Sequence, residues 1–154
     1  MKNGKILVGI THGDINGVGY EVILKLFSEP MMLELCIPII YGSPKVATYH
    51  RKAMELTTNF VTIQKADEEG KLNLVDCLEE EVKIDFGQPS AESGKAALAA
   101  LERAMVDYRE RLFDVLVTAP INKATIQGDG FHFPGHTEYI QERVGEGREA
   151  LMIL

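Results

Sequence analysis

Short apolar runs alternate along this chain with segments of helical periodicity, and no other feature constrains the fold as strongly. The runs cover residues 6–10, 37–41, 60–63 and 115–118, and each has the length and composition of a buried strand. Strands that alternate with helices predict an α/β fold, with a mostly parallel sheet and helices on both faces. No internal repeat or low-complexity linker marks a domain boundary within the chain.

Prolines and capping residues indicate where the first helices begin and end. An amphipathic pattern follows a glycine-rich turn near the N-terminus, and we expect Pro30 to end that helix. Pro44 suits the first position of a second helix, over residues 45–56, with Ser43 as its cap.

A long amphipathic helix is expected after the candidate cap Ser90. Its apolar residues fall on one face, which is typical of core packing: Ala97, Leu101, Ala104, Met105, Tyr108 and Leu112. Its charged residues fall largely on the other face: Glu102, Arg103, Asp107 and Glu110. Further along, residues 137–144 predict another helix, and the residues from Leu151 onward predict another strand.

The segment 67–85 differs from the rest because carboxylates crowd around one short apolar piece at 72–75. So loose a cluster does not favour a catalytic or metal-binding role. We expect a solvated hairpin or excursion from the core.

Composition excludes several classes of partner. The net charge of −7 and the pI near 5.1 argue against a surface for nucleic acid or anionic membrane, so any phosphate must be bound by local groups. Cys36 and Cys77 lie outside any C-x-x-C spacing, which disfavours structural zinc and favours reduced thiols over a disulfide. No apolar run reaches the ~20 residues that cross a bilayer, and residues 6–10 are too few for a signal-peptide core. We expect a cytoplasmic protein.

The chain closes on apolar residues, 150–154, whereas domains usually end in a polar tail. We hypothesise that a buried strand is interrupted here and that residues 1–154 are the N-terminal portion of a longer protein. The alternative is a terminal edge strand with exposed apolar side chains.

The glycine-rich turn at residues 13–19 follows the first predicted strand. It lacks the third glycine of a G-x-G-x-x-G dinucleotide loop and the Gly-Lys-Ser/Thr of a Walker A loop. It can still present backbone N–H groups to an anion, or serve only as a tight strand–helix turn. Asp14 is a candidate for capping the helix or for contacting substrate, and we favour the structural role.

A second polar segment follows the strand at 115–118, where ligands usually bind in an open α/β sheet. His132 and His136 have the i, i+4 spacing of helical metal ligands, but Pro134 and Gly135 forbid a regular helix between them. His136 is therefore a candidate ligand-binding side chain or a surface histidine, and Thr137 is a candidate ligand contact or helix cap.

Lys123 lies just past Pro120 in the same segment. A lysine in a cleft can neutralise a phosphate or carboxylate, and most lysines are simply solvated. His12 and His50 have no partner pattern and are expected to be structural or exposed.

Both polar segments resemble one family, the 4-hydroxythreonine-4-phosphate dehydrogenases of vitamin B6 synthesis. I-T-H-G-D-I-N-G-V-G-Y-E at residues 10–21 is similar to the family's I-T-x-G-D-P-A-G-I-G-P-E. V-T-A-P-I-N-K at 117–123, followed by G-H-T-E at 135–138, is similar to its T-G-P-x-x-K…G-H-T-E. Ile15, Asn16 and Tyr20 depart from the first motif, and we expect them to loosen its turn.

The resemblance implies a fold like that of isocitrate and isopropylmalate dehydrogenases, with two α/β domains, an active site in the cleft between them, and a homodimer. It implies that His136 and Thr137 contact a small phosphorylated substrate; Lys123 and Asp14 are weaker candidates. It also implies NAD as cofactor and a divalent metal ion (zinc, magnesium or cobalt). The family's three metal-binding histidines lie beyond the second motif and match no residue here.

The implied reaction is NAD-dependent oxidation and decarboxylation of 4-phosphooxy-threonine to 3-amino-2-oxopropyl phosphate. Two alternatives stay open: a sister dehydrogenase acting on 4-phosphorylated threonate or erythronate, and a non-catalytic module that binds a phosphorylated ligand. If the chain is only a fragment, we expect it to be inactive by itself.

Overall fold

A computed structural model describes residues 1–2, 4–64, 68–128 and 130–153 of the chain. Five strands form one sheet in the order β3-β4-β2-β1-β5, and every neighbouring pair is parallel. The strands are β1 (Ile6–Thr11), β2 (Cys36–Gly42), β3 (Phe60–Ile63), β4 (Leu72–Asp76) and β5 (Val115–Thr118). The predicted α/β class with a parallel sheet is confirmed.

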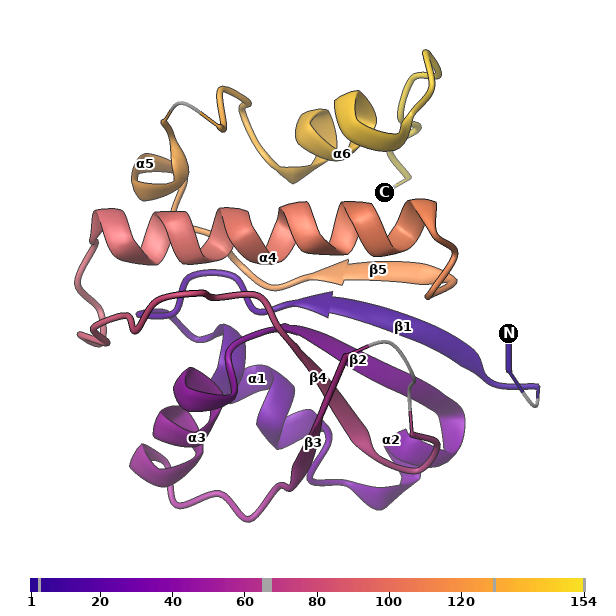
Figure 1. Ribbon diagram of the computed structural model, residues 1–154, viewed down its shortest axis with the longest axis vertical. Helices are drawn as coiled ribbons and strands as arrows, with labels where there is room; N and C mark the ends of the chain where they lie inside the picture. Colours follow the sequence, from indigo (N-terminus) through magenta and orange to yellow (C-terminus); the bar gives the residue numbers. More distant parts are fainter. Residues whose placement is uncertain (3, 65–67, 129, 154) are drawn as a thin grey trace.

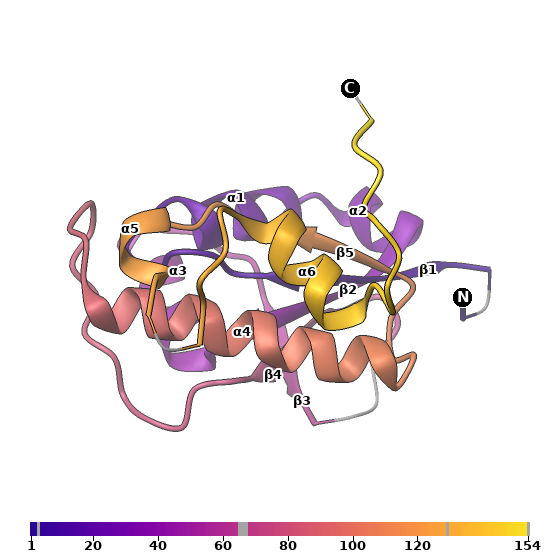
Figure 2. The same cartoon turned by 90° about the horizontal axis from the view of Figure 1, so that it is seen from above.

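Helices cover both faces of this sheet (Figure 1). One layer holds α1 (Gly19–Leu26), α2 (Pro30–Leu35) and α3 (Pro44–Ala53). The other holds α4 (Ala91–Arg109), α5 (Lys123–Ile126) and α6 (His136–Val144), with α5 and α6 both packed on α4 (Figure 2). No helix among the described residues combines the length and the apolar character needed to cross a bilayer.

Alternation along the central strands divides the core into two layers. Ile39 and Tyr41 of β2 pack with α4, whereas Ile40 between them packs with the α1 and α3 side. Because successive strand residues point to opposite faces, a strand buried on both faces needs a continuous apolar run. This is why residues 37–41 could be identified as a strand from sequence.

The expectation of a solvated hairpin across the acidic segment was wrong for its apolar piece. Leu72–Asp76 forms β4, an inner strand that pairs with both β2 and β3, and its first four residues are buried. The polar residue within the run, Asn73, is satisfied inside the sheet: its side-chain amide donates to the Pro38 carbonyl at 3.1 Å and to the Glu68 carbonyl at 3.0 Å. Residue 67, the first of this segment, lies outside the described residues.

Several predicted boundaries also differ. Pro30 begins the short helix α2, since α1 has already ended at Leu26. Ser90 caps α4 as predicted, with its hydroxyl accepting from the Ser93 N–H at 3.0 Å. Ser43 occupies the N-cap of α3 but makes no capping hydrogen bond with its side chain.

The pattern near the C-terminal end of α4 was misjudged. Asp107, expected on the solvated face, is buried, whereas Tyr108, expected in the core, is exposed. The carboxylate of Asp107 accepts from the Tyr41 hydroxyl at 3.0 Å and from the Arg103 side chain at 2.9 Å, so its charge is paired inside the protein. Burial and this carboxylate raise the pKa of Tyr41.

The predicted C-terminal strand does not form within the described residues. Leu151, Met152 and Ile153 are extended without strand pairing, and each is more than two-thirds exposed. The segment is held by α6, where the Gln141 side chain accepts from the Ala150 N–H at 2.8 Å.

Candidate functional site

The two polar segments meet at one edge of the sheet. β1 and β5 are parallel neighbours, so the residues that follow them lie side by side. The Ala119 N–H donates to the Thr11 carbonyl at 3.0 Å, and the Asp14 N–H donates to the Pro120 carbonyl at 2.9 Å. The helices that follow the two strands lie on opposite faces of the sheet. This is a topological switch point, where open α/β sheets bind ligands.

Glycine is required where the segments touch. Gly13 has a φ of +74°, and a Cβ there would overlap the Pro120 carbonyl oxygen. A Cβ at Gly19, where α1 begins, would overlap the His12 carbonyl oxygen and lie 3.1 Å from the Ala119 Cβ. These glycines bring the first turn against the second segment.

Asp14 has a local structural role. Its carboxylate accepts from the Asn16 N–H at 2.9 Å and closes an Asx turn. It does not cap α1, whose N-cap residue is Val18. The capping interpretation was therefore wrong, and the carboxylate instead closes the turn that precedes the helix.

The three residues that depart from the first motif, which we expected to loosen the turn, are each buried or hydrogen-bonded to another segment. Ile15 is fully buried. Asn16 fastens the loop before α4: its side chain accepts from the Asp85 N–H at 2.8 Å and donates to the Gln88 carbonyl at 2.8 Å. The buried Tyr20 hydroxyl accepts from the Ser43 N–H at 2.8 Å, which ties α1 to the end of β2.

Beneath the turn, His12, Tyr20 and His50 form a buried aromatic stack. The rings of His12 and Tyr20 stack at 5.2 Å, and those of Tyr20 and His50 lie 5.1 Å apart. The His50 ring contacts the Ile15 carbonyl through Nε2 at 2.7 Å. Burial lowers the pKa of His12 to about 4, so its ring is neutral near pH 7. Both histidines are structural, as one of the sequence alternatives held.

The second segment is shaped by Asn122. Its side chain caps α5 by accepting from the N–H groups of Ala124 at 3.0 Å and Thr125 at 3.4 Å. Gly94 of α4 lets this short helix approach closely, because a Cβ there would overlap the Thr125 carbonyl oxygen. Lys123, the first residue of α5, is thereby held by a fixed backbone and remains exposed.

The structure brings Lys123 and His136 together. A Cβ on Gly135 would lie 4.0 Å from the Lys123 Nζ, which places the ammonium beside the N-terminus of α6. His136 is the first residue of α6, and Gly135 is its N-cap. The first N–H groups of a helix lack intrahelical acceptors and carry partial positive charge. The Glu138 carboxylate lies at the same place, 3.6 Å from that Cβ position, so an ammonium, a carboxylate and a helix N-terminus meet at one spot.

His136 is half-buried, and one of its ring nitrogens has no hydrogen-bond partner. Its Nε2 atom is buried without a hydrogen-bond partner. Burial, and then the charge of Lys123, lower the pKa of His136, so the imidazole is neutral near pH 7. A neutral imidazole can donate one hydrogen bond and accept another.

Thr137 lies beside His136 but does not cap the helix, since Gly135 occupies the N-cap position. Its hydroxyl contacts the Met152 sulfur at 3.9 Å, which is a weak interaction. Lys123, His136 and Thr137 thus gather at one helix end, and Asp14 joins the same sheet edge through its backbone bond to Pro120.

Sequence reasoning missed Asn16 and Asn122. Asn122 carried a usable signal, because asparagine before a helical segment is a preferred cap. Asn16 carried none, because its partners are distant in sequence. No metal-binding group is found within the described part of the chain, where no three His, Cys, Asp or Glu side chains converge as ligands.

Comparison with known proteins gives consistent matches. Residues 34–154 match the family described as pyridoxal phosphate biosynthetic protein PdxA. The 4-hydroxythreonine-4-phosphate dehydrogenase of Bacteroides thetaiotaomicron is 64% identical over 156 residues, which cover all of this chain and 43% of the relative. The D-threonate 4-phosphate dehydrogenase of Cupriavidus necator is 31% identical, over 96% of this chain and 46% of that protein.

A solved structure of a protein with the same enzyme name also aligns with this chain. The crystal structure of a 4-hydroxythreonine-4-phosphate dehydrogenase from Burkholderia phymatum aligns with a TM-score of 0.83 and 29% identity, over 93% of this chain and 44% of that one. The chain therefore spans less than half the length of these relatives.

Proposed function

This chain belongs to the family of the pyridoxal phosphate biosynthetic protein PdxA, and from that membership we propose that it is the N-terminal part of a two-domain dehydrogenase. Its substrate is a small phosphorylated molecule, and the complete protein works as a cytoplasmic homodimer. One observation carries the assignment of a site to this chain: the Lys123 ammonium lies beside the N-terminus of α6, where His136 has an unpartnered Nε2.

The phosphate of the substrate binds at this helix end. The chain carries a net charge of −7, so a dianion is not attracted by the protein as a whole. Local groups must provide the attraction, and an ammonium at a helix N-terminus is a combination that suits phosphate. The exposure of Lys123 leaves its Nζ free to approach a ligand.

His136 and Thr137 orient the substrate. The neutral imidazole of His136 donates a hydrogen bond to a substrate oxygen or accepts one from it. The Thr137 hydroxyl has only a weak sulfur contact to give up when it binds a ligand oxygen. Fixed on the first turn of α6, both side chains hold the substrate in one pose, which is a positioning contribution to rate.

The reaction we propose is the oxidation and decarboxylation of 4-phosphooxy-threonine to 3-amino-2-oxopropyl phosphate. NAD, when bound, supplies the hydride acceptor for the oxidation. The described residues do not fit a site for the divalent metal ion (zinc, magnesium or cobalt) that the family resemblance implies, because no three donors converge. We assign that ion to residues outside this chain and derive no step through it.

The closest alternative substrate is a 4-phosphorylated threonate or erythronate, since relatives at 31% identity carry both the hydroxythreonine and the D-threonate name. The 64% identical relative named 4-hydroxythreonine-4-phosphate dehydrogenase favours the amino substrate. The second alternative, a non-catalytic module, requires this chain to bind a phosphorylated ligand tightly without NAD or metal.

A chimeric enzyme tests the proposal. Residues 1–154 are continued by the part of the Bacteroides thetaiotaomicron relative that lies beyond its match, and NADH formation is measured with the amino and the hydroxy substrates. We expect the amino substrate to be favoured, and His136→Ala to raise the KM and lower the kcat. The matched control is His132→Ala, an exposed histidine four residues earlier. If His136→Ala left KM and kcat unchanged, the substrate would not bind at this helix end.

A further inference from the structure

The four-residue helix α5 carries Lys123 and is too short to be stable by itself. Its position therefore depends on contacts with other parts of the protein. Ile126 is buried in the core layer that α4 covers. Gly94 of α4 lets α5 pack closely, since a Cβ there would overlap the Thr125 carbonyl oxygen. Both of these contacts lie at the end of α5 that is away from Lys123.

Asn122 holds the end of α5 at which Lys123 lies. Its side-chain oxygen accepts from the N–H groups of Ala124 at 3.0 Å and Thr125 at 3.4 Å. Its carbonyl oxygen accepts from the Ile126 N–H at 3.1 Å and from the Thr125 hydroxyl at 3.2 Å. Four hydrogen bonds thus converge on the residue that precedes Lys123, and two of them depend on its side chain.

Gln127 ties the other end of α5 to the segment that leads into α6. Its side-chain amide donates to the Phe133 carbonyl at 2.8 Å, shortly before the N-cap Gly135. Between these residues, Gly128 and Phe131 exchange two backbone hydrogen bonds, at 3.1 and 3.0 Å. These contacts set where the start of α6 lies relative to α5.

Lys123 and His136 meet across this arrangement. The Lys123 Nζ lies 4.0 Å from the position of a Cβ on Gly135, the residue before His136. The lysine charge reaches the imidazole, because it is one of the causes that lower the pKa of His136. Among the residues that the structure describes, the ammonium has no hydrogen bond or ion pair of its own. Its place therefore follows from the backbone that carries it.

We infer that Asn122 and Gln127 are positioning residues for the proposed phosphate site: they hold the Lys123 ammonium beside His136, so that both groups bind one phosphate. The inference rests on the proposed function in taking phosphate as the ligand. Neither side chain has to touch the ligand, because each acts through the backbone of α5. The competing account is that the Glu138 carboxylate, 3.6 Å from the same Gly135 position, draws the lysine side chain there whatever the backbone does.

NMR of the histidine rings in the 154-residue protein tests this, with inorganic phosphate as the probe. Asn122→Ala removes the capping oxygen, whereas Asn122→Ser retains one. We expect Asn122→Ala to raise the pKa of His136 towards its value in Lys123→Met, and to weaken phosphate binding about fivefold, as the loss of a cap does for a helix. Asn122→Ser should restore both quantities. Gln127→Ala should also raise the pKa of His136, because α5 and α6 are then no longer tied together.

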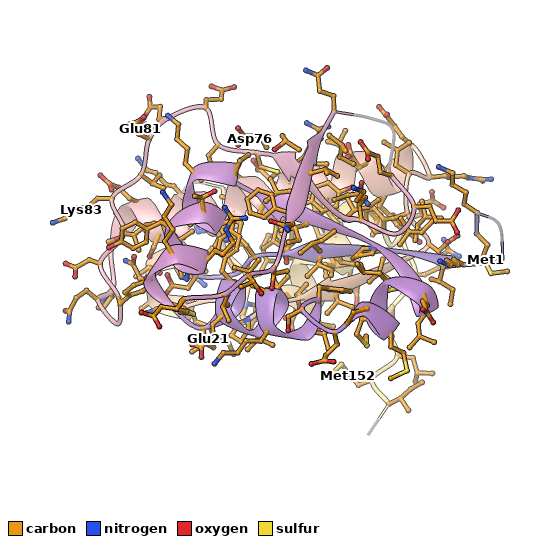
Figure 3. All side chains as sticks on the ribbon, turned by 90° about the horizontal axis from the view of Figure 1, so that it is seen from below. Met1, Glu21, Asp76, Glu81, Lys83 and Met152 are labelled. Atoms are coloured by element: carbon orange, nitrogen blue, oxygen red, sulfur yellow. The ribbon has the colours of Figure 1, made fainter. Side chains whose placement is uncertain are left out.

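Asp76→Ala is the matched control, since it too removes a side-chain acceptor of a backbone N–H, that of Leu78 at 3.3 Å. Figure 3 shows Asp76 and Met152 at opposite edges of the molecule, and Met152 contacts Thr137 beside His136. The control should change neither the pKa of His136 nor the affinity for phosphate.

An unchanged pKa of His136 in either alanine variant would overturn the assignment of that residue, and would leave Glu138 to place the ammonium. Equal losses in Asn122→Ala and Asn122→Ser would also overturn the role of Asn122, because the cap would not be the cause. The pKa measurement needs no ligand, so it separates this inference from the proposed function. A wild-type protein that does not respond to phosphate counts against the proposed phosphate site, while the pKa values still decide whether the two residues position Lys123.

Discussion

The backbone N–H of Asp14 donates a hydrogen bond to the carbonyl oxygen of Pro120 at 2.9 Å. This bond joins the turn that follows β1 to the segment that follows β5. The two segments can approach this closely because residue 13 is a glycine. The candidate site is therefore supported by contacts between segments at opposite ends of the sequence. The predictions below test those contacts individually.

Gly13→Ala should destabilise the fold by about 3 kcal/mol or more, since it adds a positive-φ penalty to an overlap with the Pro120 carbonyl. Gly87→Ala is the matched control: its φ is also +74°, but nothing lies within 4 Å of the added Cβ. We expect the control to cost about 1 kcal/mol. Urea unfolding measures both, and equal losses would mean that the close approach to Pro120 does not matter.

Asn16→Ala should cost about 2 kcal/mol and release the loop before α4, because the side chain bonds both the Asp85 N–H and the Gln88 carbonyl. Limited proteolysis should then cleave within residues 85–90, where the wild type resists. Asn59→Ala, at an exposed asparagine, provides the comparison. An Asn16 variant as resistant as the wild type would show that this loop is held by other contacts.

Asp107→Ala should cost about 3 kcal/mol, since it leaves the buried Tyr41 hydroxyl without its acceptor and the Arg103 side chain without its partner. Asp85→Ala removes a carboxylate from an exposed position and should be nearly neutral. Denaturant midpoints separate the two cases. If both variants lost a comparable free energy of unfolding, the buried contacts of Asp107 would stabilise the fold no more than a surface carboxylate does.

His12 should make the fold sensitive to mild acid. Its pKa is lowered from 6.5 to about 4 by burial, so the unfolded chain binds a proton in a range where the folded protein does not. The stabilisation is complete above pH 6.5 and is lost as the pH falls toward 4, amounting to about 3 kcal/mol. His12→Met should flatten this part of the stability–pH curve, measured by urea unfolding at several pH values. His132→Met, at an exposed histidine, should leave the slope as it is.

Lys123→Met should raise the pKa of His136, because the lysine charge is one of the two causes that lower it. Burial, the larger cause, remains in the variant, so the pKa should stay below its ordinary value. A titration of the His136 ring resonances by NMR in the 154-residue protein measures this without any enzyme assay. Lys95→Met, at an exposed lysine on α4, should have no effect. If the pKa of His136 did not change in Lys123→Met, the ammonium would not lie beside the ring.

Local pattern was sufficient for four of the five strands but not for β4. Its run, Leu72–Asp76, is short, contains Asn73 and is followed by a row of glutamates, so the surrounding charge outweighed it. Asn73 is tolerated inside the sheet because its amide finds the Pro38 and Glu68 carbonyls, which only the folded chain supplies. For the same reason Asp107 could not be distinguished from a solvated helix residue.

The sequence by itself determined the parallel α/β class, the two glycine-containing turns, the helix after Gly135, and the family to which the motifs point, because each depends on periodicity or spacing between residues near one another in the chain. Only the tertiary structure decided that Lys123 lies beside His136, that Asn16 and Tyr20 tie the first turn to distant segments, and that Asp107 is buried. Those relationships depend on strand order and on which faces the helices cover. They arise from packing between distant segments, and local composition carries no record of it.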